Sequence, residues 1–360
     1  MLGYRGDWKA LVALFNMKRN YSVNEVWCLG KITQFKKETL VLEPSTLTGQ
    51  VLHLPCCMQV CWLCQATKGQ DDDLSCCMTD VSPTAGWWQT FLREVPWDSP
   101  PSYFNITGFE IGMVVPDLLH CWNLGLARDL LGSALKLILS ERLVFNAPCI
   151  ADRLKLASES LRAFAKQKRY PLRIKKLTKS KLCWQTRKYP SLAASGYDAF
   201  VVGVWLEDLL SNHSQTFPEI CTMLWAGNRA ISLMYSTNLF LNEQEKESLA
   251  ILGDCLLRTY ISMARIAMEN NALLWRVRPK LHMMCHIFRS PRSINQSRYS
   301  TWMDEGFLKT IGKTMGLTDC RGSQVRCLQR WLLSIPQHLQ KNLGDLASQS
   351  LTCTLRPTRS

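Results

Sequence analysis

Apolar positions that recur every three or four residues dominate this chain from residue 118 onward. Such spacing places the apolar side chains on one face of an α-helix. The first 20 residues show the same pattern, with Trp8, Leu11 and Phe15 on or near one face. The pattern predicts helices at 1–20, 118–140, 151–168, 196–212, 217–235, 243–276, 303–315 and 321–340.

Strand signals are fewer. The apolar run from Phe109 to Val115, ended by Pro116, predicts a buried strand. Residues 22–55 have weak periodicity, with short strand-like runs at 39–42 and 51–54. We therefore expect an α+β fold that is predominantly helical.

Changes in composition divide the chain into six segments, and no internal repeat is apparent. The segments are a core helix at 1–21, an atypical insertion at 22–55, a Cys-rich segment with its connector at 56–108, a strand with a helical region at 109–276, a C-terminal core segment at 277–345 and a mobile polar tail at 346–360. The connector is predicted at residues 95–108, which are rich in Pro and Ser and should be extended.

The chain has 360 residues, of which 47% are hydrophobic and 20% are charged, a composition typical of globular domains rather than disordered proteins. Lys and Arg exceed Asp and Glu by 43 − 29 = 14. This excess favours a polyanionic partner, most commonly nucleic acid, although a basic surface that binds nothing is also consistent with it. The sequence shows no signal peptide and no apolar run of about 20 residues. We therefore expect an intracellular protein, with no membrane span and with reduced cysteines.

Two cysteines, Cys61 and Cys64, have the two-residue spacing that lets both thiolates reach one tetrahedral ion. Cys56, Cys57, Cys76 and Cys77 flank the pair. Two interpretations stay open, a zinc site and a group of buried thiols that pack as small hydrophobes. A redox dithiol is disfavoured, because no strand, motif and helix of the thioredoxin kind surrounds the pair.

Three histidines are candidate metal ligands. His282 and His286 are four residues apart, so on a helix they share a face and could bind one ion. No Glu follows His282 directly, which disfavours a metalloprotease, and the alternative is a half-buried helix with two satisfied histidines. His120 follows Asp117 by three residues; Asp117 is placed to cap a helix, and His120 could turn toward the same metal site.

Acidic and basic positions complete the candidates. Asp7 could cap the first helix, and Glu305, after Asp304, could begin a late one. In a functional interpretation, Asp7 and Glu305 could instead bind a divalent cation such as Mg²⁺, which prefers oxygen ligands. A basic loop lies between two predicted helices, with the candidate DNA-binding residues Arg173, Lys175, Lys176, Lys179 and Lys181.

Taken in order, these motifs resemble the transposases of CACTA-type (En/Spm-like) DNA transposons. The series here is Asp7, then Cys61-Trp-Leu-Cys64, Asp117-Leu-Leu-His120, His282-Met-Met-Cys-His286 and Trp302-Met-Asp-Glu305. The resemblance implies an RNase H-like catalytic core interrupted by a long helical insertion. It also implies that Asp7 and Glu305 match the second and third acids of a centre that binds Mg²⁺ or Mn²⁺. Cys61, Cys64, His282 and His286 would match a zinc site.

The chain also departs from this family. Only six residues precede Asp7, so the strand that carries the family's first catalytic Asp is absent, and we expect an incomplete core. The first functional hypothesis is therefore a transposase-derived, nuclear DNA-binding protein without full strand-transfer activity. The alternative is a zinc-stabilised helical protein that binds other proteins. A third hypothesis is a product without function, whose incomplete core exposes apolar surface.

Overall fold

The computed structural model divides the chain into two compact units, Met1–Ser300 and Thr301–Ser360. All the helices and strands named below belong to the first unit. The structure describes residues 19–20, 26–27, 60–61, 63–68, 76–93, 105–110, 113–290, 293–302, 329 and 332–333. The predicted helices at 303–315 and 321–340 therefore lie almost wholly outside the described residues, as do the tail at 346–360 and most of the segments at 1–21 and 22–55.

Helices make up most of the described part of the first unit. A π-helix, η4, spans Leu119–Leu126 and continues into α2, with non-helical backbone angles at Gly125. The remaining α-helices and the shorter elements follow in chain order. They are η1 (Gly86–Trp88), α2 (Ala127–Ser140), α3 (Ile150–Gln167), α4 (Gly196–Leu210), η5 (Ser211–His213), α5 (Pro218–Ser236), α6 (Glu243–Glu269), α7 (Pro279–Phe288) and η6 (Gln296–Tyr299).

Local signals in the sequence explain where these helices begin. Asn242 and Glu245 form a capping box at the start of α6, in which each side chain accepts a hydrogen bond from the other residue's backbone N–H at 2.8 Å. Pro218 and Pro279 occupy the first turns of α5 and α7, where a missing N–H costs nothing. The predicted helices at 118–140, 151–168, 196–212 and 217–235 are confirmed.

The predicted helix at 243–276 is too long, because α6 ends at Glu269. Asn271 takes a φ of +52°, which turns the chain out of the helix. The apolar pattern continues beyond the helix because Trp275 is buried there: it is 1% exposed, and its backbone N–H donates to Ser133 Oγ on α2.

The predicted strand at 109–115 is wrong for the residues that the structure describes there, 109–110 and 113–115. Phe109 and Met113 close turns through backbone bonds to Ile106 and Glu110, so this part of the chain folds back on itself. Among the described residues, the only named strands are β1 (Arg19–Asn20) and β2 (Val26–Trp27), an antiparallel pair in which Arg19 faces Trp27. β1 covers the last two residues of the predicted helix at 1–20, so the helix prediction is wrong at those two residues.

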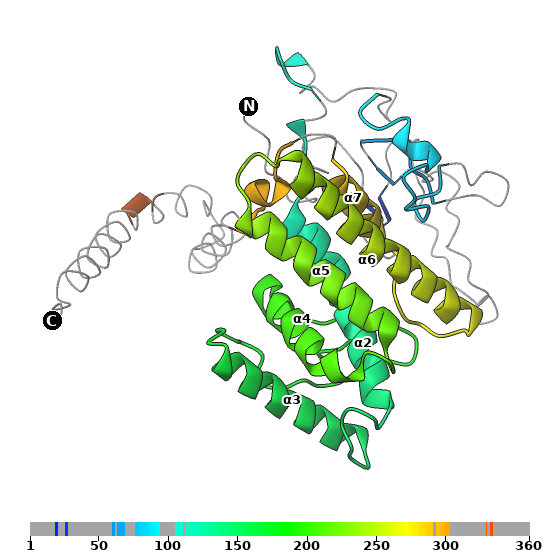
Figure 1. The fold of residues 1–360 in the computed structure, drawn as a ribbon, viewed down its shortest axis with the longest axis vertical. Coiled ribbons are helices and arrows are strands. Elements are labelled where there is room, and N and C mark those ends of the chain that lie inside the picture. Colours follow the sequence, from blue (N-terminus) through cyan, green and yellow to red (C-terminus); the bar gives the residue numbers. More distant parts are fainter. Residues whose placement is uncertain are drawn as a thin grey trace. The chain divides into compact units, whose positions relative to one another are not determined.

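The helices pack around one apolar core that includes residues from η1 to α7. Figure 1 shows α5 and α6 side by side, with α4 between α5 and α3. α7 packs against both η4 and α6. At Gly253 on α6, an added Cβ would lie 2.5 Å from Phe288 Cβ, so only glycine allows α6 to approach α7 this closely.

A buried ion pair fixes the start of α7. Arg278, directly before α7, is paired with Asp129 on α2, whose side chain is 2% exposed. Burial raises the pKa of Asp129, while the positive charge of Arg278 opposes that rise. The pair therefore connects α2 to the segment that leads into α7.

No helix within the described ranges combines the length and the apolar character needed to cross a bilayer.

Candidate metal centre

Four predicted metal ligands come together in the first unit. Cys61 and Cys64 lie in the Cys-rich segment, and His282 and His286 lie one turn apart on α7. Their sulfur and nitrogen atoms are all within 4.8 Å of one another, although up to 225 residues separate them in the sequence. This group could hold a metal ion.

The distances between donor atoms match those expected for zinc. The Cys61 Sγ to His286 Nε2 distance is 3.3 Å, and the Cys64 Sγ to His282 Nε2 distance is 3.2 Å. The two Nε2 atoms are 3.0 Å apart. Ordinary zinc bond lengths with tetrahedral angles give about 3.5 Å between sulfur and nitrogen and about 3.3 Å between nitrogens. These separations are compatible with a tetrahedral zinc ion bound by the four atoms.

The loop around the two cysteines is shaped for thiolate ligands. The Leu63 N–H donates to Cys61 Sγ at 3.2 Å. Burial raises the pKa of Cys64, and a backbone hydrogen bond with Ala66 opposes that rise. The Val60 N–H donates to the Ala66 carbonyl at 2.9 Å and closes the loop. Because N–H donors stabilise negative charge on sulfur, these contacts favour the thiolate form that binds metal.

The ligands are enclosed by aromatic rings. The side chains of all four are at most 1% exposed. The Phe91 ring is stacked on His286 with centroids 4.4 Å apart, and Trp87 meets His282 edge to face at 4.4 Å. Among the described residues, neither histidine Nδ1 has a hydrogen-bond partner. The rings are therefore oriented by packing rather than by hydrogen bonds to Nδ1.

The two thiols are electrostatically coupled. Burial would raise the pKa of Cys61, but a hydrogen bond with Cys64 and the charges of the histidines hold that pKa well below its usual range. Burial and the neighbouring Cys61 raise the pKa of Cys64. The two pKa values therefore shift in opposite directions, and a divalent ion bound to both sulfurs would allow both to be thiolates.

His286 favours the neutral form that binds metal. Burial lowers the pKa of His286, against the opposing influence of Cys61. A neutral imidazole has a free nitrogen lone pair, which is the ligand form.

The fifth predicted metal ligand, His120, is not part of this group. Its Nδ1 pairs with the Asp117 carboxylate, which also accepts hydrogen bonds from the N–H groups of Leu119 and His120. The prediction that Asp117 caps a helix is thus confirmed. His120 is turned toward its own helix N-terminus instead of the cysteines.

The predicted catalytic acids Asp7 and Glu305 lie outside the described residues. All five predicted DNA-binding residues, in contrast, are described and exposed. Trp87 and Phe91, whose rings contact the histidine ligands, were not predicted as site residues. The adjacent tryptophans that follow Gly86, so close to the cysteines, were the available signal.

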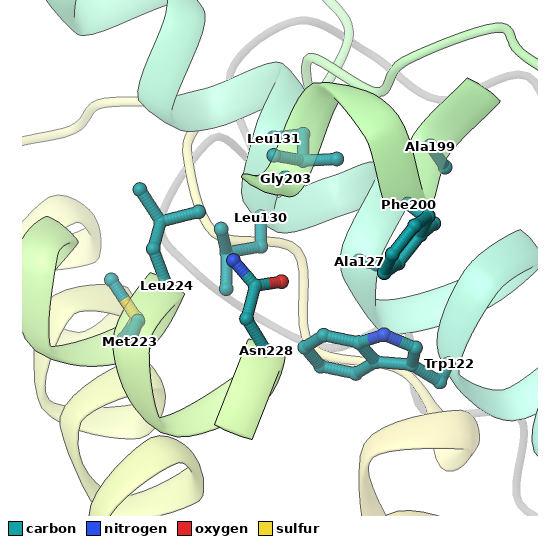
Figure 2. A pocket seen from close by; sticks show the side chains of 10 residues that line it. All are labelled: Trp122, Ala127, Leu130, Leu131, Ala199, Phe200, Gly203, Met223, Leu224 and Asn228. Carbon is teal, nitrogen blue, oxygen red and sulfur yellow. The ribbon is translucent and has the colours of Figure 1, made fainter. Parts of the chain in front are cut away.

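A small pocket lies elsewhere, where η4, α2, α4 and α5 meet. Figure 2 shows its lining, in which Trp122, Phe200 and Leu130 accompany the amide of Asn228. That amide donates to Glu207 Oε2 at 2.7 Å. The lining is almost wholly apolar and contains no ionisable side chain, so we assign no chemistry to this pocket.

Comparisons with protein-family models, with curated proteins and with solved structures found no match to this chain.

Proposed function

We propose that this chain is a helical protein that binds other proteins and is stabilised by a structural Cys₂His₂ zinc centre. Four buried donor atoms, all within 4.8 Å of one another, support this proposal. Two sulfurs and two nitrogens suit zinc better than a hard cation such as Mg²⁺. Because four protein ligands complete a tetrahedron, no position is left for a substrate, and the role is structural rather than catalytic.

The centre joins α7 to a part of the chain that has little regular secondary structure. Among the described residues of 60–93, η1 is the only helix, and backbone bonds such as Leu92 N–H to the Leu63 carbonyl hold the rest of that stretch. Zinc would fasten it to α7 through two bonds on each side. Structural zinc contributes about 10–16 kcal/mol of binding free energy in small finger peptides, enough to order such a segment.

Metal analysis of the purified full-length chain tests the proposal. Zinc content should fall by one ion per chain in Cys64→Ser and in His286→Ala. Co²⁺ bound in place of zinc should show the visible absorption of a tetrahedral site with thiolate ligands. Cys149→Ser is the matched control, because Cys149 is exposed and Ser also caps helices well. Equal zinc content in all four proteins would exclude this centre.

A transposase-derived DNA-binding protein is the second candidate. Two motifs of the CACTA-like series, 218 residues apart, contribute to one centre, and this supports the reading. On this reading the helical region is the insertion of an RNase H-like core, and Asp7 and Glu305 keep some affinity for Mg²⁺ or Mn²⁺. DNA binding, rather than full strand transfer, is the retained activity.

Mn²⁺ binding to zinc-loaded protein tests this second candidate. Asp7→Asn and Glu305→Gln should each weaken Mn²⁺ binding while leaving zinc content unchanged. Asp304→Asn, one residue from Glu305, is the control. If none of the three changes Mn²⁺ binding, the assignment of the acids is wrong.

A further inference from the structure

Eleven cationic residues and no acidic residue lie between positions 160 and 197. The whole chain has 43 Lys and Arg, so about a quarter of them fall in roughly a tenth of its length. They belong to the second half of α3 and to the segment that joins α3 to α4. We call these eleven residues the cationic face: Arg162, Lys166, Lys168, Arg169, Arg173, Lys175, Lys176, Lys179, Lys181, Arg187 and Lys188.

Every member of the cationic face is exposed. Among the described residues, none of the eleven forms an ion pair with a carboxylate. Their contacts are with neutral groups: Lys181 Nζ donates to the Ala193 carbonyl, and Lys179 lies over the Trp184 ring. Within the described ranges, the positive charge of the face is therefore not neutralised by direct ion pairs.

Two carboxylates flank the face in the sequence. Glu159, three residues before Arg162, is exposed but forms no ion pair with a member of the face among the described residues. Asp198, at the start of α4, is 3% exposed. It accepts hydrogen bonds from Ser195 Oγ at 2.8 Å and from the Arg173 N–H at 2.9 Å. Its charge is thus used to cap a helix and to hold the segment in place.

The segment is anchored so that its cations stay outside. Ile174, Leu177 and Leu182 are buried between the exposed lysines. The Leu177 N–H also donates to Ser158 Oγ on α3, at 2.9 Å. Fixed attachment points reduce the conformational entropy that a charged segment loses when it binds a partner.

We propose that the cationic face binds the phosphate backbone of duplex DNA without reading its bases. Phosphate contacts need positive charge and reach, which the eleven side chains supply. Of the five aromatic residues between positions 160 and 197, Phe164, Tyr170 and Trp184 are at least partly buried, and only Tyr189 and Tyr197 are exposed. With eleven exposed cations beside two exposed rings, phosphate contact is favoured over stacking on unpaired bases. This binding site is separate from the zinc centre, and it can be tested without reference to it.

The test measures the affinity of the full zinc-loaded chain for a short mixed-sequence DNA duplex over a series of salt concentrations. Affinity should fall steeply with salt and should change little with sequence. Lys175→Gln with Lys176→Gln should weaken binding on the order of tenfold or more, and should make the salt slope shallower by up to about 1.8. The control removes the same charge from α5 and α6 through Arg229→Gln with Arg265→Gln, both exposed.

Equal losses in the two double variants would overturn the proposal, since they would reflect net charge alone. Tighter binding to single-stranded DNA, lost on Tyr189→Ala, would replace phosphate contact with base stacking. Binding to anionic lipid vesicles in preference to the duplex would also overturn it. Zinc content, measured on the same samples, separates a failure here from a failure of the zinc centre.

Discussion

The His286 ring is oriented by packing against aromatic side chains rather than by a hydrogen bond to its Nδ1. Phe91 is stacked on its ring, and Trp87 and Trp88 meet it edge to face. In most metal sites, the second nitrogen of a histidine ligand donates to a carboxylate or a carbonyl. Here that nitrogen has no partner among the described residues, so the aromatic residues determine the ring's direction.

Phe91→Ala should therefore weaken zinc binding by roughly tenfold, because it removes the ring that fixes His286. Competition with a chelator of known affinity measures the change. Phe240→Ala is the control, since Phe240 is 66% exposed and lies outside the centre. Equal zinc affinity in Phe91→Ala and wild type would show that packing does not position the ligand.

At the scale of elements, apolar periodicity and caps predicted most helices well. They failed where an apolar residue is buried outside a helix or named strand, as at Trp275 and Val114. Apolar patterning reports that residues are buried, but it does not report which backbone conformation buries them. The close packing of α6 on α7 at Gly253 had no signal at all in the sequence.

Gly253→Ala should destabilise the protein by about 1–3 kcal/mol, although alanine favours helices, because its Cβ would collide with Phe288. Urea unfolding measures the change. Gly203→Ala on α4 is the comparison, since its Cβ would meet only the end of the Asn228 side chain, at 3.2 Å. That substitution should cost less or be stabilising. A stabilising Gly253→Ala would contradict the tight packing of α6 on α7.

Asp129→Ala should cost about 3 kcal/mol in the same assay, because it leaves Arg278 largely buried without its carboxylate. The comparison is Glu243→Ala. It removes the ion pair of Glu243 with Lys246, in which the Glu243 side chain is 86% exposed. That change should cost less than about 1 kcal/mol. Similar losses in both variants would mean that the Asp129 pair is no more important than a surface pair.

At the scale of the whole molecule, the helical body and the Cys-rich segment differ in what holds them. Helices α2 to α6 share an extensive apolar core. The described residues of 60–93 reach that core through side chains such as Val60 and Trp87, and through the four candidate ligands. Metal should therefore affect this segment far more than it affects the helices.

Removal of zinc with a chelator should expose the segment at 60–93 to limited proteolysis while most of the helical circular dichroism remains. Re-addition of zinc should restore protection. The Cys64→Ser protein should be cleaved there with or without zinc. A cooperative loss of all helical signal on chelation would show instead that the body itself requires the metal.

The amino-acid sequence by itself determined the helical character of the chain, most helix limits, the Cys61–Cys64 and His282–His286 spacings and the concentration of positive charge after α3. These are local properties, set by residues within a few turns of one another. Only the tertiary structure decided that the two motifs share one centre, that His120 stays with Asp117, and that the eleven cations have no carboxylate partners among the described residues. Contacts across more than 200 residues depend on how helices pack, and packing depends on side-chain shapes that periodicity does not encode.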